Sequence, residues 1–276
     1  LHLSIRRQRQ MCIRDSTDSP KFQGTKTNVA FDATTDTINL VGGGNFDSIT
    51  DFDAVGSLDD FGGILPEGTY DFGGAAGSTT LDLGGVFSLT LKRHFQGVGF
   101  YTGDLFDNRT DFIDTWTNFD GIEAPDANAK LAVRTSTDMS SYSDFNDFAN
   151  GTFKGRGFQF RATLNTSDTA QNINLQQLGY SATLPSRTEQ SAVIASGAGA
   201  KAVTFTAPFF VGTSGLGNLN NFLPSVNISP QNMATGDYFV LSSISGTGFT
   251  VHFKNSSNAS IDRNFTYSAV GFGKGG

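Results

Sequence analysis

Short stretches in which apolar and polar residues alternate run through this chain, and they constrain its fold more than any other feature. Apolar residues occupy every second position in residues 87–91, 158–164, 203–207, 249–253 and 265–269. Successive side chains of a strand point to opposite faces, so this alternation predicts strands with one buried and one solvated face. No segment has the sustained 3.6-residue apolar spacing of an amphipathic helix.

Glycines lie between these stretches at the places where the chain must turn. Examples are Gly42-Gly43-Gly44, Gly62-Gly63, Gly73-Gly74, Gly84-Gly85 and Asn150-Gly151. Glycine adopts positive φ without a steric penalty, as tight hairpins and bulges require. A one-sided sheet of this kind buries its apolar face against a second sheet. The chain is therefore predicted to be all-β, with two tandem antiparallel β-sandwiches.

Composition changes along the chain suggest where these sandwiches begin and end. Residues 17–60, rich in aspartate, are expected to be a partly mobile leading segment, and the Ser-, Ala- and Gly-rich residues 185–200 a linker or a loose first strand. The first sandwich is then expected over residues 61–184 and the second over residues 201–276.

Residues 1–16 differ from the rest of the chain in carrying four closely spaced arginines. Their apolar part is too short and interrupted for a signal peptide. The ending Met11-Cys12-Ile13-Arg14-Asp15-Ser16 resembles translated sequencing-adapter read-through from metagenomic contigs, so we expect an artefact here and a natural chain that extends further upstream. Removing four arginines and one aspartate changes the net charge from −7 to −10 and removes Cys12, the one cysteine.

The net charge argues against nucleic acid as a partner, and the distribution of apolar residues argues against insertion into a membrane. Nucleic-acid recognition needs a basic surface that neutralises phosphates, whereas this chain has a net charge of −7. Membrane insertion is not expected either, because no window approaches 18 consecutive apolar residues. Residues 17–276 contain no cysteine, so they cannot form disulfides or thiolate metal sites. Sheet packing or oligomerisation must therefore stabilise them.

No catalytic, cofactor or metal site is predicted. His94 and His252 lack a nucleophile motif, and His252 falls on the polar face of an expected strand. Aspartates are so numerous that pairs suited to glycoside hydrolysis would arise without function. Residues 51–56 begin like a calcium loop but place Val55 at a ligand position, and the glycine runs lack the Lys-Ser/Thr of a phosphate loop.

Aromatic residues in polar surroundings are the remaining candidates for ligand binding. Sugar rings stack their C–H faces on aromatic side chains, while nearby polar groups bind the hydroxyls. The candidates are Trp116, Tyr101, Tyr142 and Tyr238, with His94 as a candidate partner for a ligand carboxylate. The alternative for each aromatic residue is a place in the core, and for His94 a solvated side chain.

Residues 116–184 resemble a discoidin-type, galactose-binding-like jelly roll. The likeness rests on residues 131–138 (LAVRTSTD), 142–145 (YSDF) and 155–161 (GRGFQFR). The closing strand of that family commonly reads Ala-Arg-Tyr-Ile-Arg-Phe. In this chain, Gly157-Phe158 stands in place of the small residue, the arginine and the tyrosine that begin that strand.

Residues 201–273 resemble the H-type lectin module. This likeness rests on residues 203–205 (VTF), 224–229 (PSVNIS), 248–251 (GFTV) and 265–271 (FTYSAVG). Tyr267 stands where that family usually has tryptophan, and its sugar-contacting histidine and tryptophan have no evident counterpart. The resemblance therefore implies a lectin-like fold without a transferable sugar specificity.

Residues 61–276 as a whole, including residues 68–72 and 81–84, resemble the C-terminal region of tail-tip host-specificity (J-like) proteins of tailed phages. This resemblance implies a homotrimeric virion component at the tail tip, in contact with other tail proteins, that attaches to a host surface glycan or outer-membrane protein. The expected function is thus non-enzymatic host recognition.

Three alternatives remain open from the sequence. The chain could be an extracellular carbohydrate-binding accessory region of a secreted bacterial enzyme or adhesin. It could instead be a purely structural trimerising spacer of the tail. A depolymerase acting through aspartate pairs has the least support, because no pair stands out among the aspartates.

Overall fold

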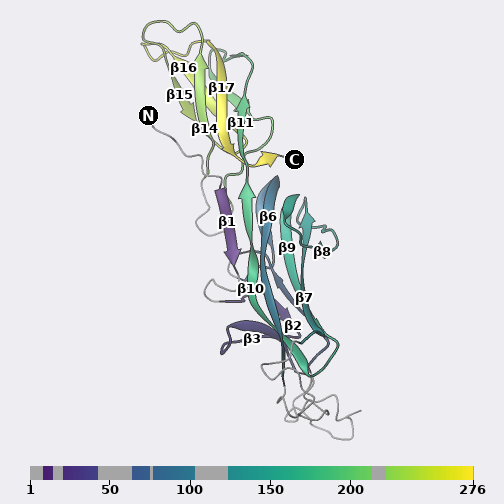
Figure 1. Ribbon diagram of the computed structural model, residues 1–276. Helices are drawn as coiled ribbons and strands as arrows, with labels where there is room; N and C mark the ends of the chain where they lie inside the picture. The colour runs from purple at the N-terminus through teal and green to yellow at the C-terminus, as the bar shows by residue number, and fades with distance from the viewer. Residues whose placement is uncertain are drawn as a thin grey trace, which may run out of the picture.

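The computed structural model describes residues 9–14, 21–42, 64–74, 77–102, 124–212 and 222–275. Every named element among them is a β-strand, and the strands pair in antiparallel sheets (Figure 1). The all-β prediction is therefore confirmed. None of these residues belongs to a helix that could cross a membrane.

The larger of two units is an 11-stranded antiparallel sheet. Its strands are β1 (Arg9–Arg14), β2 (Thr25–Thr27), β3 (Val29–Asp32), β4 (Thr37–Leu40), β5 (Glu67–Phe72), β6 (Leu81–Tyr101), β7 (Ala127–Ser136), β8 (Asn146–Asp147), β9 (Gly151–Thr166), β10 (Gln171–Leu184) and β18 (Lys274–Gly275). The main path runs β2-β5-β9-β6-β10-β4-β3, while β1 pairs with β10, β7 with β8 and β9, and β18 with β6.

Two long strands give this sheet its shape, because each changes partner along its length. Strand β9 pairs with β6 over residues 151–158 and with β5 over residues 160–165. Strand β6 pairs with β9 over residues 81–91 and with β10 over residues 90–101. The sheet thereby curls around one core, to which strands β3, β4, β5, β6, β7, β9 and β10 contribute.

Stacked aromatic rings form the centre of that core. Phe160 stacks on Phe72, at a ring-centroid distance of 5.5 Å, and on Tyr180, at 4.1 Å. All three side chains are buried, and the Tyr180 hydroxyl donates a hydrogen bond to the carbonyl of Gly73. The predicted alternation is confirmed in β9, where residues 158, 160, 162 and 164 are fully buried and the intervening residues are half-exposed.

The smaller unit is a sandwich of two sheets. Its strands are β11 (Ser186–Gln190), β12 (Ile194–Ala195), β13 (Ala200–Thr204), β14 (Ser225–Pro230), β15 (Tyr238–Ser242), β16 (Gly248–Lys254) and β17 (Asn264–Phe272). One sheet has the order β11-β17-β12, with β14 also on β17, and the other has the order β13-β16-β15. The two sheets enclose a separate core that includes Phe249, Val251, Phe253 and Phe265.

Two parts of the expected division need correction. Residues 185–200 are not a linker but include the first strands of the smaller unit, which was the alternative expectation, because β11 and β12 both pair with β17. Small side chains suffice there since β17 supplies the apolar residues Phe265, Tyr267 and Ala269. In the described part of residues 17–60, strands β2, β3 and β4 belong to the larger sheet, with Ile38 and Leu40 buried.

Part of the suspected artefact, residues 9–14, is described in the structure. Residues 9–14 pair along β10 as strand β1. This pairing describes the conformation of the segment and not its origin, so the adapter interpretation stays a prediction.

Candidate functional site

Strands β7 and β9 carry a row of long polar side chains on the solvent side of the larger sheet. Arg134 of β7 lies opposite Gln159 of β9, and Arg161 of β9 lies between Ala132 of β7 and Asp71 of β5. Their chain neighbours, including Val133 and Phe160, are buried in the core. The period-two geometry of both strands therefore places these polar groups on the outer face.

A loop between β7 and β8 folds back towards this row and brings two aromatic residues to it. The Arg134 guanidinium carbon lies 5.2 Å from the ring centroid of Tyr142 and 4.5 Å from that of Phe145. The Arg161 guanidinium carbon lies 4.4 Å from the same Phe145 centroid. We call these four residues the arginine–aromatic strip. Cation–π attraction stabilises such contacts by about 0.5–1 kcal/mol each at exposed sites.

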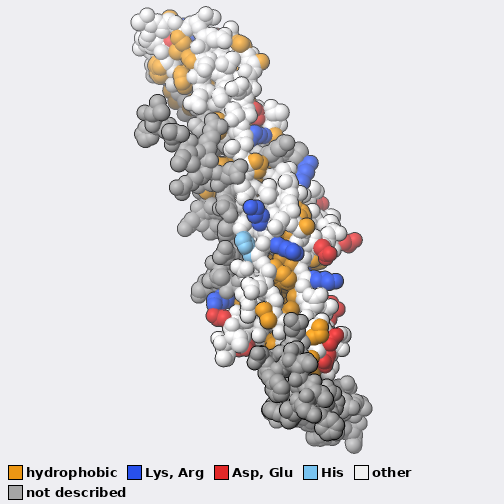
Figure 2. Space-filling model, viewed as in Figure 1, with side chains coloured by type: hydrophobic (Ala, Val, Ile, Leu, Met, Phe, Trp, Pro, Cys, Tyr) orange, Lys and Arg blue, Asp and Glu red, His pale blue; other side chains and the backbone are white. Residues whose placement is uncertain are grey.

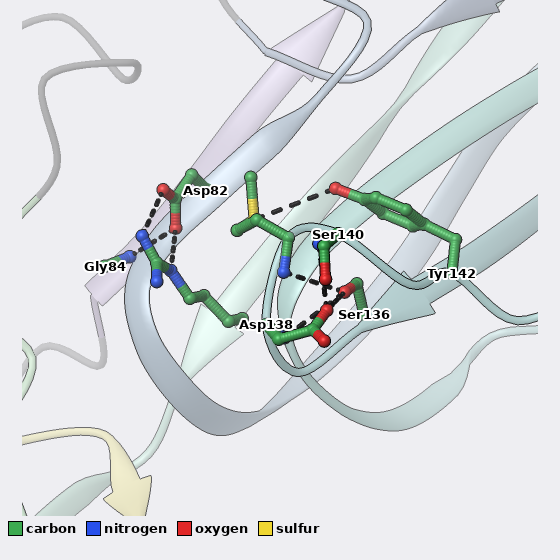
Figure 3. A network of polar contacts seen from close by, with 8 residues as sticks. Asp82, Gly84, Ser136, Asp138, Ser140 and Tyr142 are labelled. Carbon is green, nitrogen blue, oxygen red and sulfur yellow. Dashed lines mark hydrogen bonds and ion pairs between the residues drawn. The ribbon is translucent and has the colours of Figure 1, made fainter.

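The loop is held by hydrogen bonds around one carboxylate, drawn in Figure 3. Asp138 Oδ1 accepts bonds of 2.9 Å from the Ser136 hydroxyl and from the backbone N–H groups of Ser140 and Ser141. These donors hold the pKa of Asp138 far below its ordinary value, the Ser141 N–H contributing most. The carboxylate thus fixes the first turn of the loop that carries Tyr142.

Close packing beneath Tyr142 favours glycine in β9. A Cβ added at Gly157 would stand 2.5 Å from Met139 Sδ and 2.6 Å from the Tyr142 hydroxyl oxygen. That hydroxyl contacts Met139 Sδ at 3.7 Å, and burial raises the pKa of Tyr142. The tyrosine therefore lies down against the sheet instead of projecting into solvent.

Polar neighbours hold the arginines of this face in fixed orientations. Arg134 Nε donates to Gln159 Oε1 at 2.7 Å, and Gln159 Nε2 donates in turn to Thr80 Oγ1 at 2.6 Å. Arg161 forms a two-pronged pair with Asp71, with both nitrogen–oxygen distances 2.7 Å. Contacts within the chain thus hold the arginines of the strip in one arrangement.

A second two-pronged pair borders the strip. Arg156 Nε and Nη2 donate to the two oxygens of Asp82 at 2.9 and 3.1 Å, and the Gly84 N–H adds a bond of 2.8 Å (Figure 3). The Arg156 hydrogen bonds are the main cause of a lowered pKa at Asp82. Basic and acidic side chains are likewise interspersed on the face of the larger unit that Figure 2 shows.

The four predicted site residues that the structure describes do not form one site. Tyr142 belongs to the arginine–aromatic strip, whereas Tyr101 accepts a 3.2 Å bond from Gln171 Nε2 at the end of β6. Tyr238 lies in the smaller unit and donates to Asn258 Oδ1 at 2.6 Å. His94 Nε2 lies 2.5 Å from the Ser181 hydroxyl, between β6 and β10. Trp116 lies outside the described residues, as does the calcium-like loop of residues 51–56.

The sequence interpretation passed over Arg134, Phe145 and Arg161 as site residues. Arg161 carried a usable signal, because it lies on the polar face of the clearest alternating strand. Phe145 carried none, since its role depends on how the loop folds back. Within the described part of the chain, no group of three or more His, Cys, Asp or Glu side chains is arranged to hold a metal ion.

Comparisons with known protein families, with curated proteins and with solved structures found no match to this chain. The function is therefore inferred from the geometry of the strip, and the resemblances drawn from sequence stay predictions.

Proposed function

We propose that this chain is a non-enzymatic adhesion region that binds a cell-surface glycan at the arginine–aromatic strip. The observation that carries the proposal is the order of the strip itself. Its two rings and two guanidinium groups are held by an anchored loop, a glutamine and an aspartate on the solvent side of a rigid sheet. Binding sites ordered in advance lose less side-chain entropy when a ligand arrives.

The chemistry of the strip suits sugars in two respects. Tyr142 and Phe145 are half-exposed, so each ring keeps some apolar carbon open to the C–H groups of a sugar ring. Gln159, Thr80 and Ser143 lie around them with amide and hydroxyl groups of the kind that binds sugar hydroxyls. A glycan lying across β7 and β9 would meet both kinds of group.

The resemblance to tail-tip host-specificity proteins supports a place for this function. In that setting the chain is part of a homotrimer at the tip of a phage tail, held by other tail proteins, and its receptor is a bacterial surface glycan or an outer-membrane protein. Trimeric display would raise the avidity of weak single sites through their high effective concentration. The elongated, end-to-end arrangement of the two units in Figure 1 favours such display.

A binding experiment on the whole chain tests the proposal. The chain is applied to a bacterial glycan array, and hits are remeasured with Tyr142→Ala and with Tyr238→Ala, a tyrosine in the smaller unit. We expect glycan binding that Tyr142→Ala weakens at least about tenfold and Tyr238→Ala preserves. Folded protein that binds no glycan, or an affinity that Tyr142→Ala leaves unchanged, would contradict the proposal and favour a structural spacer.

A further inference from the structure

We infer that the arginine–aromatic strip selects an acidic sugar and binds its acid group through Arg134. This inference deepens the proposed function and rests on it, since it specifies the ligand of the same site. The chemical class is a glycan that carries a carboxylate or another compact anion on the ring, and the carboxylate is the form that the geometry favours.

The first step of the argument is a comparison of three arginines on one face. Arg156 and Arg161 are each neutralised by a two-pronged aspartate. Arg134 has no ion-pair partner among the described residues. Because Asp71 and Asp82 are already engaged by their own arginines, they do not compete for Arg134. An incoming anion would therefore meet one uncompensated guanidinium here.

The second step concerns which atoms of Arg134 are engaged. Its Nε donates to Gln159 Oε1, and no described residue accepts a hydrogen bond from Nη1 or Nη2. A guanidinium presents its donors as a planar fork that matches the two oxygens of a carboxylate. With Nε occupied, the two terminal nitrogens remain as the pair that can bind such a group end-on.

The third step is the position of this guanidinium relative to the aromatic rings. Tyr142 and Phe145 both lie within cation–π distance of it, and Gln159 fixes its near end. These contacts hold the guanidinium plane and exclude part of its hydration, which strengthens an ionic hydrogen bond. A sugar with its acid group on Arg134 would place its ring beside these same aromatic residues.

The test compares ligands that differ only in charge. The probes are uronate- and sialate-containing oligosaccharides, their neutral methyl esters, and a sulfated oligosaccharide. Charged hydrogen bonds of this kind imply that the methyl esters bind about 10- to 100-fold more weakly than the free acids. We expect the carboxylates to bind more tightly than the sulfated probe, since sulfate does not match the flat fork as closely.

Two variants and one control assign that preference to Arg134. Arg134→Gln removes the charge and should abolish the preference for acid over ester. Arg134→Lys keeps the positive charge but lacks the planar fork, so it should retain only part of the preference for acid over ester. The lysine variant also provides the test if Arg134→Gln fails to fold. Lys154→Gln, an exposed charge on the same strand as Arg161, is the matched control and should leave the preference unchanged.

The outcomes separate this inference from the proposed function. Equal binding of acids and esters, with loss of both in Tyr142→Ala, would overturn the inference and leave the glycan site intact. An acid preference that survives both Arg134 variants would also overturn it. Tighter binding of the sulfated probe would overturn the preference for carboxylate. Absence of binding to every probe and to every glycan of the array would remove both proposals.

Discussion

Phe209 and Phe210 are adjacent in the chain, yet each is buried in a different hydrophobic core. Phe209 packs in the smaller unit, where its ring lies 3.9 Å from the Arg187 guanidinium carbon. Phe210 packs in the larger unit, edge-on to Phe87 at a ring-centroid distance of 5.7 Å. Together with the pairing of β18 on β6, this dipeptide ties the two units together.

The two phenylalanines should therefore destabilise different units when truncated. Phe210→Ala is expected to cost the larger unit about 3–5 kcal/mol of unfolding free energy, because it leaves a cavity beside Phe87. Phe209→Ala should cost the smaller unit a similar amount. Urea denaturation combined with hydrogen exchange measures both effects and locates them. A loss below about 1 kcal/mol in either variant would contradict the assignment of its ring to that core.

Gly157→Ala should disturb the loop above β9. The new methyl group would collide with Met139 Sδ and the Tyr142 hydroxyl, which are ends of side chains that can move. We expect a stability loss of about 1 kcal/mol and a displaced Tyr142, with weakened glycan binding. Gly151→Ala is the matched control, since nothing lies within 4 Å of a Cβ at that position. Equal binding by the two variants would argue against a role for the loop.

The lowered pKa of Asp138 predicts that the loop after β7 loosens only in strongly acidic solution. Its pKa is lowered in the folded chain, so its hydrogen bonds stabilise the loop above the ordinary value of 3.8 and are lost as the pH falls through the lowered value. The loop should therefore hold throughout neutral and mildly acidic solution. Amide chemical shifts of Ser140 and Ser141, followed by NMR against pH, report this titration. A midpoint at or above pH 3.8 would contradict the hydrogen bonds described.

The raised pKa of Tyr267 predicts that the folded state loses stability in alkaline solution. Burial, together with its hydrogen bond of 2.8 Å to Glu189 Oε1, raises its pKa from 10.0 to about 12. A raised pKa stabilises the folded state fully below about pH 10, and that contribution is lost as the pH rises towards 12. Tyrosinate absorbance should show a late-ionising phase that Tyr267→Phe removes. A titration without such a phase would contradict the burial of this hydroxyl.

The alternation in the sequence was enough to predict strands and their buried faces. Phe158, Phe160 and Leu164 are buried as their spacing indicates, because side-chain direction along a strand depends only on position. For residues 185–200, the lack of apolar alternation left both a linker and a loose first strand open. A strand such as β11 can be poor in apolar residues when its partner, β17, supplies the core.

The arginine–aromatic strip lay beyond what a single sequence can predict. Arg134 and Gln159 meet because β7 and β9 pair in one particular register, which depends on the whole sheet. Phe145 reaches Arg161 only because the loop after β7 folds back over the sheet. Tyr142 was predicted as a ligand contact from its polar surroundings, but its packing against Arg134 needed the structure.

The most direct test of the central claim is the affinity of the whole chain for a glycan hit before and after Tyr142→Ala, with Tyr238→Ala as control. Isothermal titration measures all three proteins, and circular dichroism confirms that each is folded. The account predicts that Tyr142→Ala weakens binding at least about tenfold, as expected when an aromatic contact at the centre of a site is lost, while Tyr238→Ala binds like the unaltered chain. Unchanged affinity in folded Tyr142→Ala would contradict it.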